Sequence, residues 1–451
     1  MTSIAALSSS AVAHRGERTA PGDSDAGVSP ARAAMDRDAN GRFDDAFEVG
    51  ERIGAGGLGT VHACRARGNV NAKIPRGMPL VVKTVRVRLD AGGCVRANVP
   101  TSGRVDAEIR ALRRLDACAE RDSNAASAMF PSLVAAFSGR HVEKRSPEDA
   151  ARNLTSSAAR VVMTNPVGAS SCDLLRLRAE ARERRGDENA QFPESEARFY
   201  AAQIVVALRY LHARARLAHG DVKPENVLVR RGTGVVALCD FDLARSLTTK
   251  VSPESRENEA ARGDEVINDE VIASGAAEKG TASRSGVVGT PEYVAPEAAR
   301  GAVAGATAQT DWYQLGVFAF ELVFGTTPFA APFGVVGMTL RAVEANDLRF
   351  FDALFAAAAT TTSGVSENRK RKLQRKETSH AASVPFLRFT RALLEGDPES
   401  RLGDADVRRA EFFACVDWEA LERGERGIAG RAARARGARE DWILFLSEEN
   451  S

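Results

Sequence analysis

Two kinds of apolar spacing divide the chain near residue 163. Before that point, Val-rich runs bounded by Gly predict strands, and they cover 47–66, 79–88, 132–137 and 160–164. One helix is expected among them, because Ile109, Leu112 and Leu115 recur on a single face of the segment from Arg104 to Leu115. Beyond Met163 the spacing becomes mostly helical.

The strongest helical pattern in the second part runs from Glu194 to Ala213. Acidic residues fall in its first turn, where they complement the helix dipole. Short β-like runs follow at 225–229 and 235–239. We interpret the polar or weakly patterned stretches as inserted loops, and these stretches are 141–158, 248–285 and 357–384.

Composition narrows the class of protein only in part. A chain of 451 residues can hold one large two-lobed domain or two ordinary ones, and a hydrophobic content of 44% allows a sizeable core. The net charge of +2 shows no overall basic bias toward nucleic acid. The six cysteines are scattered without a C-x-x-C pair, which argues against a zinc site or disulfide framework and fits a reducing compartment. No apolar run approaches the roughly 18 residues that a transmembrane helix needs.

A glycine-rich segment lies inside the first strand region. It reads Gly54-Ala55-Gly56-Gly57-Leu58-Gly59-Thr60-Val61, and it fits the pattern G-x-G-x-x-G-x-V. Glycines let backbone amides approach phosphates closely. Dinucleotide-binding folds share part of this pattern, but they need a helix next, whereas Val61-His62-Ala63 continues as a strand. On this motif alone, a plain glycine-rich hairpin remains an alternative.

The most specific feature is the run His219-Gly220-Asp221-Val222-Lys223-Pro224-Glu225-Asn226. Asp240-Phe241-Asp242 begins 19 residues after Asp221. Phosphoryl transfer needs a carboxylate that orients the attacking hydroxyl, together with an Asn and a second Asp that hold magnesium. Asp221, Asn226 and Asp240 supply these three groups at the required spacing.

Further motifs follow in a fixed order. They are Gly289-Thr290-Pro291-Glu292-Tyr293-Val294-Ala295-Pro296-Glu297, Asp311-Trp312-Tyr313-Gln314-Leu315-Gly316, Gly325-Thr326-Thr327-Pro328-Phe329 and Asp397-Pro398-Glu399-Ser400-Arg401-Leu402-Gly403. With these motifs, residues 47–420 resemble the serine/threonine protein kinases of the AGC type. The Asp-Phe-Asp triplet and the insertion at 248–285 are typical of the plant subgroup that includes the phototropins.

The resemblance implies the α+β fold class, and within it a bilobal protein kinase fold. We expect a small β-rich N-lobe over 47–163 and a larger, mainly helical C-lobe over 164–424. A disordered tail over 1–44 would precede this domain, with order beginning at Phe47, and a short tail over 425–451 would follow it. In that tail, Trp442 and Phe445 have the spacing of an F-x-x-F motif, although a chance amphipathic end explains them equally well.

The resemblance also assigns residues to ATP and Mg²⁺. Met163 is expected before a hinge at Thr164-Asn165-Pro166 whose backbone would bind adenine. Asp173 would contact ribose, or it is simply an acid in the first turn of the next helix. The full set expected at ATP is Gly54, Ala55, Gly56, Gly57, Leu58, Gly59, Val61, Val81, Lys83, Met163, Thr164, Pro166 and Asp173.

Catalysis is expected to depend on four side chains and two metal ligands. Lys83 ends the apolar run Leu80-Val81-Val82 and would reach the α and β phosphates, although a surface lysine at a strand end is an equal alternative on this motif alone. Glu108 would be its ion-pair partner. The remaining roles implied by the resemblance are the hydroxyl proton for Asp221, the γ-phosphate for Lys223, and Mg²⁺ for Asn226 and Asp240.

Protein substrates with Ser or Thr are expected to carry upstream basic residues. Glu225 and Glu321 match acidic positions that bind arginine in basophilic AGC kinases, which would favour Arg-x-x-Ser/Thr sequences. Thr378 lies in such a sequence and is a candidate autophosphorylation site. The resemblance further implies that Glu297 and Arg401 form a buried structural ion pair, and that Asp311 braces the catalytic loop.

Four positions depart from the kinase pattern. Gly220 replaces an arginine that clamps a phosphate on the activation segment, and Gly286 occupies the usual phosphorylated position. We therefore predict activity that does not depend on that clamp, with Ser285 as a displaced phosphorylation site. Val81 replaces a smaller residue beside adenine. Asp242 replaces a glycine that eases the metal-binding turn, and Asp tolerates the positive φ expected there. The alternative function is a pseudokinase, an ATP-binding scaffold without turnover.

The remaining expectations concern location and partners. We expect a cytoplasmic protein, with a nuclear location as an alternative because of the basic cluster Arg369-Lys370-Arg371-Lys372. The first 20 residues are poor in acids, which leaves plastid targeting as the less favoured alternative. ATP and protein substrates are the expected partners, nucleic acid is not expected, and the sequence assigns no oligomeric state.

Overall fold

The computed structural model describes twelve segments of the chain and divides the whole into two compact units. The described residues are 39–55, 59–69, 74, 76–87, 100–121, 125–141, 156–168, 171–186, 191–247, 289–303, 305–362 and 382–424. The first unit comprises residues 1–113 and 132–165, and the second comprises 114–131 and 166–451. The boundary thus lies after residue 165 rather than after 163, and the segment 114–131, expected in the N-lobe, belongs to the second unit.

The reason for this reassignment is packing within the second unit. Phe130, just after the 3-10 turn η1 (Ala125–Met129), stacks on Tyr210 with 5.7 Å between ring centroids. The ring of Phe130 also lies 6.0 Å from that of Phe241. A segment that follows a predicted N-lobe helix therefore buries its apolar side chain in the core of the other unit.

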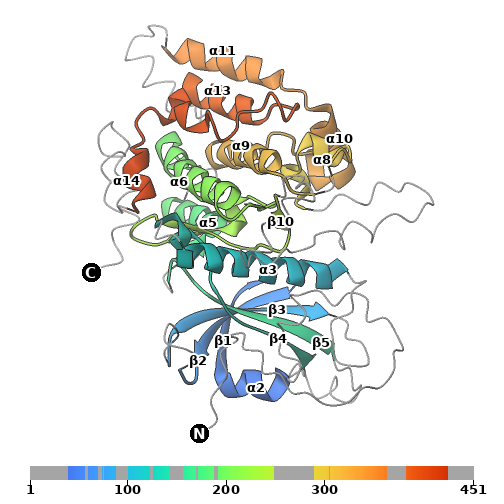
Figure 1. The fold of residues 1–451 in the computed structure, drawn as a ribbon. Coiled ribbons are helices and arrows are strands. Elements are labelled where there is room, and N and C mark those ends of the chain that lie inside the picture. Colours follow the sequence, from blue (N-terminus) through green and yellow to red (C-terminus); the bar gives the residue numbers. More distant parts are fainter. Residues whose placement is uncertain are drawn as a thin grey trace, which may run out of the picture. The chain divides into compact units, whose positions relative to one another are not determined.

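The first unit is built on one antiparallel sheet with the strand order β1-β2-β3-β5-β4 (Figure 1). The strands are β1 (Phe47–Ala55), β2 (Gly59–Ala66), β3 (Pro79–Val87), β4 (Leu133–His141) and β5 (Ser156–Thr164). The long helix α3 (Pro100–Arg121) starts earlier and ends later than the helix expected over 104–115. The insertion expected at 141–158 is bounded by strand at both ends, since β4 includes His141 and β5 begins at Ser156.

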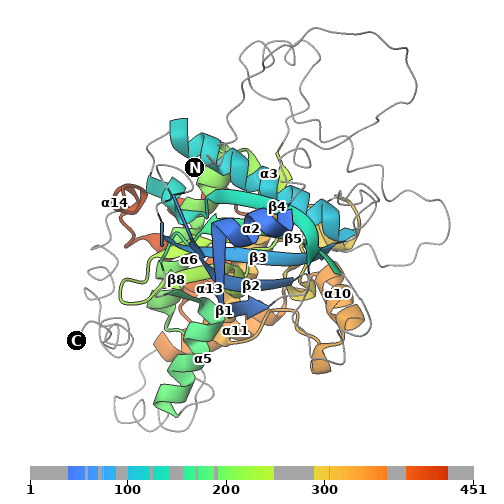
Figure 2. The ribbon, with the colours of Figure 1, turned by 90° about the horizontal axis from the view of Figure 1, so that it is seen from below.

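Helix α2 (Ala39–Ala46) begins inside the tail 1–44 that was expected to be disordered, and it packs against one face of the sheet (Figure 2). Phe43 is fully buried, with its ring centroid 5.6 Å from that of Phe47 and 5.4 Å from that of Phe137. The expectation of a tail up to residue 44 is therefore wrong for α2. A single aromatic side chain in an eight-residue polar helix has no periodic pattern, so the sequence did not reveal it.

The second unit is mainly helical, as expected. Its α-helices are α5 (Leu174–Arg185), α6 (Glu194–Ala213), α8 (Pro296–Ala299), α9 (Ala308–Phe324), α10 (Val336–Ala345), α11 (Phe350–Thr362), α13 (Val384–Leu393) and α14 (Trp418–Glu422). Helix α6 has the bounds expected from the sequence. Helices α6 and α9 pack together and bury most of their residues, which is typical of helices at the centre of a domain.

Short strands and 3-10 turns lie in the connections between these helices. The strands are β6 (Ser171–Asp173), β7 (Leu217–Ala218), β8 (Val227–Arg230), β9 (Val236–Leu238) and β10 (Arg245–Ser246), paired in the orders β6-β8-β9 and β10-β7. The 3-10 turns beyond η1 are η2 (Pro224–Asn226), η5 (Pro291–Tyr293), η6 (Pro332–Gly334), η7 (Val407–Arg409) and η8 (Glu411–Phe413).

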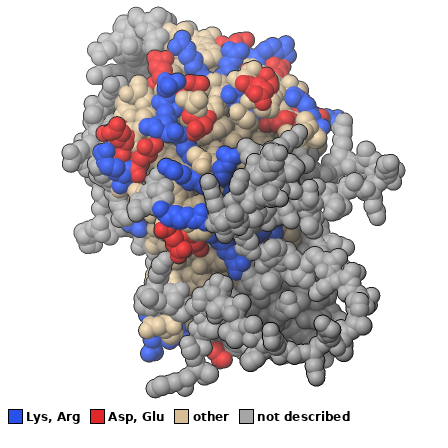
Figure 3. Space-filling view, viewed as in Figure 1, with Lys and Arg blue, Asp and Glu red and all other residues tan. Residues whose placement is uncertain are grey.

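The remaining expected segments lie partly or wholly outside the described residues. The insertion at 248–285 and the tail at 425–451 are outside them. The insertion expected at 357–384 begins inside helix α11, which continues to Thr362. None of the helices in the described part of the chain has the length and apolar character needed to cross a bilayer. On the face drawn in Figure 3, basic and acidic side chains are interspersed.

Candidate active site

Asp221 lies in the turn between β7 and η2, and its carboxylate is held by three side chains. Lys223 Nζ lies 2.7 Å from Oδ2, and Asn226 Nδ2 donates to the same oxygen at 3.0 Å. Thr290 Oγ1 donates to Oδ1 at 3.2 Å and accepts a hydrogen bond from Lys223 Nζ at 2.7 Å. Asp221 itself is buried. Its carboxylate therefore has a defined orientation, as a group that accepts a hydroxyl proton requires.

Thr290 is a site residue that the sequence analysis did not single out. It lies 69 residues after Asp221, within a motif that we quoted only as a whole. No local pattern links a threonine to a carboxylate so far away in the sequence. The available signal was its place at the start of the segment Thr290-Pro291-Glu292, immediately after Gly289.

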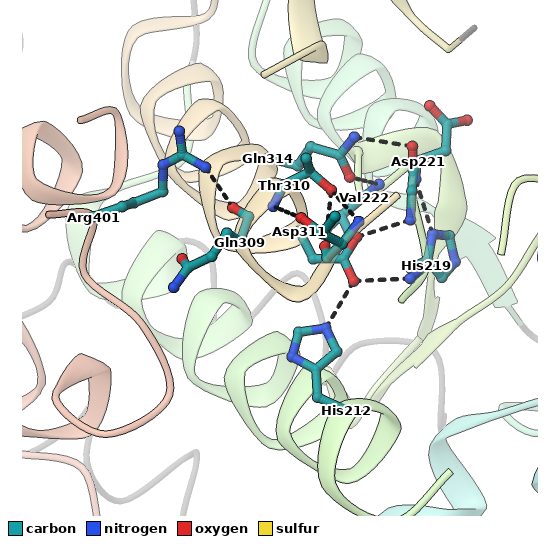
Figure 4. Close-up of polar contacts among 11 residues, drawn as sticks. His212, His219, Asp221, Val222, Gln309, Thr310, Asp311, Gln314 and Arg401 are labelled. Carbon is teal, nitrogen blue, oxygen red and sulfur yellow. Dashed lines mark hydrogen bonds and ion pairs between the residues drawn. The ribbon is translucent and has the colours of Figure 1, made fainter. Parts of the chain in front are cut away.

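Asp311 braces the backbone of the catalytic loop from helix α9 (Figure 4). Its Oδ2 accepts the backbone N–H of His219 at 2.8 Å, and its Oδ1 accepts the backbone N–H of Gly220 at 2.8 Å. The ring nitrogen Nε2 of His212, on helix α6, lies 2.7 Å from Oδ2. Asp311 is fully buried, and these donors together with the nearby N-terminus of α9 offset the loss of hydration.

His219 is a neutral imidazole whose tautomer follows from its hydrogen bonds. The backbone N–H of Asp221 points at Nδ1 across 3.2 Å, so Nδ1 is the acceptor. The other nitrogen, Nε2, therefore carries the proton and donates to the carbonyl of Cys239 at 3.1 Å. Complete burial lowers the pKa of His219, despite the opposing effect of Asp311 and other nearby carboxylates. The ring links the catalytic loop to the residue that precedes Asp240.

The two expected metal ligands, Asn226 and Asp240, lie at neighbouring ends of the β8–β9 hairpin. Asn226 Nδ2 donates to both the carbonyl and the carboxylate of Asp221, which leaves the amide oxygen as the end of the side chain that can bind a cation. The N–H of Cys239 donates to the Asn226 carbonyl at 2.9 Å, and Asp240 follows directly. An amide oxygen and a carboxylate fit Mg²⁺, which prefers oxygen ligands and usually adds phosphates and water.

The backbone at Asp240-Phe241-Asp242 differs from what the sequence suggested. We expected a positive φ at Asp242, where the kinase pattern has glycine. The residue with a positive φ is instead Asp240, at 68°. The φ of Asp242 is not positive. The turn therefore bends at Asp240, the expected metal ligand, and Asp242 is buried without left-handed strain.

In the first unit, Lys83 and Glu108 form an ion pair with Nζ 3.0 Å from Oε2. Both side chains are largely buried, with 11% of Lys83 and 3% of Glu108 exposed. The sheet register aligns Lys83 with Val61, and Val81 with Met163. Because side chains alternate between faces along a strand, these four residues share one face of the sheet. The structure thus brings together the expected phosphate-binding and adenine-binding residues of the N-lobe.

The glycine-rich segment is described at its two ends. Gly54 pairs with Val61 and Ala55 with Thr60 in the β1–β2 hairpin. A Cβ at Gly59 would lie 2.1 Å from the carbonyl oxygen of Thr84, so this position requires glycine. Gly56, Gly57 and Leu58 lie outside the described residues.

The other expected ATP contacts have defined structural partners. In the first unit, the backbone N–H of Thr164 donates to the Ser132 carbonyl at 3.0 Å, and its hydroxyl accepts from the Ser132 N–H at 2.9 Å. In the second unit, Pro166 accepts a hydrogen bond from Arg230 at 3.4 Å. Asp173 is the N-cap of α5, and its Oδ1 accepts from the N–H of Arg176 at 2.8 Å. The structure thus gives Asp173 a role close to the alternative proposed for it, an acid at a helix start.

The expected substrate-binding acids, Glu225 and Glu321, differ in their surroundings. Glu321, on α9, forms an ion pair with Arg178 of α5 at 3.1 Å and accepts a short hydrogen bond from the hydroxyl of Tyr293. Burial raises the pKa of Tyr293 well above its usual value, and the charge of Glu321 adds to this. Glu225 is exposed, yet partial desolvation raises the pKa of its carboxyl, while Lys223 opposes the rise.

Comparison with known proteins defines the class of protein first. The model of the protein kinase domain matches residues 173–413, which is more than half of the chain. The chain therefore belongs to the protein kinase family, and the bilobal α+β fold expected from the sequence is confirmed.

The relatives then define the group within that family. The chain is 31% identical to "Protein kinase PINOID" of Oryza sativa subsp. japonica over 391 residues, which are 82% of this chain and 66% of the relative. It is 34% identical to "Serine/threonine-protein kinase WAG1" of Arabidopsis thaliana over 52% of this chain and 47% of the relative. It is 30% identical to "Phototropin-2" of Oryza sativa subsp. japonica over 50% of this chain and 22% of the relative. The expected plant AGC type is confirmed, and the chain spans less than two thirds of the length of these relatives.

Proposed function

We propose that this chain is a serine/threonine protein kinase that transfers the γ-phosphoryl group of ATP to protein substrates and requires Mg²⁺. The observation that carries this proposal is the carboxylate of Asp221, which Lys223, Thr290 and Asn226 hold in one orientation. A carboxylate held in this way can accept or orient the proton of a Ser or Thr hydroxyl as the hydroxyl attacks phosphorus.

The other polar groups of the second unit have supporting roles. Lys223 steadies the γ-phosphate while it remains close to Asp221. Asn226 and Asp240 hold Mg²⁺, which neutralises charge on the phosphates when it is bound. Thr290 couples the start of the segment after the activation insertion to the catalytic loop, because its hydroxyl bonds to both Asp221 and Lys223.

The first unit supplies the nucleotide-binding groups. Glu108 orients Lys83 through the 3.0 Å ion pair, and Lys83 contacts the α and β phosphates. Val61, Val81 and Met163 lie on the same face of the sheet and provide the apolar surface for adenine. The glycine-rich hairpin from Gly54 to Gly59 covers the phosphates.

The alternative, an ATP-binding scaffold without turnover, rested on Gly220, Val81 and Asp242. Neither Gly220 nor Asp242 disturbs the loop geometry, because glycine suits the positive φ of 84° at Gly220 and Asp242 does not need one. Two relatives that the chain resembles are named as kinases. These observations favour the active enzyme.

We further propose that Glu225 provides the preference for a basic residue upstream of the phosphorylated Ser or Thr. Glu321 is already paired with Arg178 and hydrogen-bonded by Tyr293, so a substrate arginine would have to share it. Glu225 is exposed; partial desolvation raises the pKa of its carboxyl, and the nearby charges of Glu321 and Asp221 add to the rise. A peptide array should show upstream arginine preferred by the native enzyme and less preferred by Glu225→Gln. An array without any such preference would contradict this proposal.

The experiment that tests the kinase proposal is transfer of radiolabelled phosphate from ATP, with Mg²⁺, to an Arg-x-x-Ser peptide. Asp240→Ala should abolish transfer, because it removes a metal ligand. The matched control is Asp352→Ala, which removes an exposed acid from helix α11 and should transfer like the native protein. Native protein that binds ATP and transfers nothing would contradict the proposal and favour the scaffold.

A further inference from the structure

Gly220 occupies a position that is closed to side chains. Its φ of 84° is in the left-handed region that favours glycine. A Cβ at this residue would lie 2.8 Å from the Cβ of Ala306 and 3.0 Å from the carbonyl oxygen of Leu243. The arginine of the kinase pattern therefore has no room here. A loop without that arginine needs another source of rigidity next to the catalytic carboxylate.

Helix α9 provides such a source with a second side chain, Gln314. Gln314 follows Asp311 by three residues, so both lie on the same face of the helix. Gln314 Oε1 accepts the backbone N–H of Val222 at 2.9 Å, and Nε2 donates to the carbonyl of Gly220 at 2.9 Å (Figure 4). Because one partner is a donor and the other an acceptor, the orientation of the amide is determined.

The two hydrogen bonds of Gln314 lie on either side of Asp221 in the sequence. Gly220 precedes Asp221 and Val222 follows it, so Gln314 fixes the peptide groups on both sides of Asp221. Asp311 adds the backbone N–H groups of His219 and Gly220. Both helix side chains are buried, at 5% exposed for Gln314 and 0% for Asp311, so water competes little for these bonds.

We propose that Gln314 is a positioning residue, which fixes the backbone on both sides of Asp221. The carboxylate of Asp221 thereby keeps its catalytic orientation without an arginine at position 220 and without a phosphate on the activation segment. This inference rests on the proposed kinase function. A glutamine suits the position because it offers a donor and an acceptor at one side-chain end. Removing it takes a hydrogen-bond partner from the buried N–H of Val222 and from the partly buried carbonyl of Gly220.

The first test compares Gln314→Met with Gln309→Met. Methionine keeps a similar volume but makes neither hydrogen bond. Gln309 lies on the same helix, and its side-chain oxygen has no hydrogen-bond partner within the described part of the chain, so it is the matched control. Gln314→Met should lower kcat about tenfold with the KM values for ATP and peptide nearly unchanged. Gln309→Met should keep the native kcat. A Gln314→Met variant with the native kcat would overturn the proposal.

The second test does not depend on activity. Hydrogen exchange of a peptide that covers residues 219–223 reports on the N–H of Val222. In Gln314→Met this amide should exchange about tenfold faster, whereas exchange in Gln309→Met should match the native protein. Unchanged exchange in Gln314→Met would overturn the proposal. If the native protein transfers no phosphate, the kinase function fails, and the exchange result still decides the role of Gln314.

A third measurement addresses the phosphate. Native protein treated with a phosphatase, which is then removed, should keep its kcat on the Arg-x-x-Ser peptide. Loss of transfer after this treatment, restored by preincubation with ATP, would overturn the claim that the loop is held without a phosphate.

Discussion

Two buried ion pairs, one in each unit, are built in different ways. In the second unit, Arg401 and Glu297 form a two-pronged pair with N–O distances of 2.7 and 2.8 Å. The guanidinium also donates to two backbone carbonyls at 2.9 and 2.8 Å and lies over the ring of Tyr313. In the first unit, the ion pair of Lys83 and Glu108 joins one ammonium to one carboxylate oxygen at 3.0 Å.

The difference in hydrogen bonding distinguishes an ion pair that stabilises the fold from one that holds a ligand-binding side chain. The planar fork of arginine directs its donors in fixed directions, and in Arg401 the protein uses them in four hydrogen bonds. A lysine ammonium is a compact charge on a flexible stem, which suits contact with phosphate oxygens. The pair of Arg401 and Glu297 therefore stabilises the fold, whereas the pair of Lys83 and Glu108 is suited to orient the lysine that we propose as catalytic. The following changes test that distinction, beginning with the largest expected effect.

Arg401→Met should lower the free energy of unfolding by about 3–5 kcal/mol, because it leaves the carboxylate of Glu297 buried and unpaired. Urea unfolding measures this change. Transfer per folded molecule should stay near native, since neither residue belongs to the proposed catalytic groups. Combining Arg401→Met with Glu297→Leu should recover much of the loss. A decrease in the free energy of unfolding below about 1 kcal/mol in Arg401→Met would contradict a stabilising role of this ion pair.

Lys83→Arg keeps the charge of the ion pair and changes its geometry. We expect transfer to fall about tenfold to a hundredfold, equivalent to about 1.4–2.7 kcal/mol in the activation free energy. The free energy of unfolding should change by less than in Arg401→Met, because an ion pair to Glu108 can still form. Transfer kinetics and urea unfolding on the same sample separate the two effects. Native transfer by this variant would count against the catalytic role of Lys83.

Gly220→Ala tests the rigidity of the loop beside Asp221, the proposed catalytic residue. The positive φ and the contact with Ala306 should lower the free energy of unfolding by about 2 kcal/mol, with reduced transfer. Adding Ala306→Gly removes the 2.8 Å contact and should restore part of both properties, while the strain at positive φ remains. Urea unfolding and the peptide assay measure the recovery. Equal losses in the single and double variants would show that crowding by Ala306 has no role.

The smallest expected effect is a dependence of stability on pH through His219. Its pKa is lowered from 6.5 by burial, so below about pH 6.5 the unfolded chain binds a proton that the folded protein does not. Stability should therefore fall as the pH drops below this value. His219→Asn should reduce the slope of unfolding free energy against pH. Some slope should remain, because burial also lowers the pKa of His62. The same slope in the variant and the native protein would contradict the neutral state of His219.

The sequence by itself determined the elements and the order of the chemical groups. Helix α6 has the bounds that its apolar period and acidic first turn predicted, and the strands in the described part of the first unit fall within or close to the predicted runs. Asp221, Asn226 and Asp240 could be predicted as site residues because their spacing along the chain matches the groups that phosphoryl transfer needs. These features depend on neighbours that are close in the sequence, so local patterns are enough to reveal them.

Only the tertiary structure decided which distant groups complete the site. Thr290 contacts a carboxylate 69 residues away, and Arg178 reaches Glu321 across 143 residues. The partners of Gln314 are 92 and 94 residues away, and nothing around it in the sequence indicates a role. Phe43 and Asp242 were misjudged for a related reason, since burial and backbone angles are set by the whole fold. Local spacing predicts helices, strands and motifs, whereas packing selects the side chain that lies at the right distance.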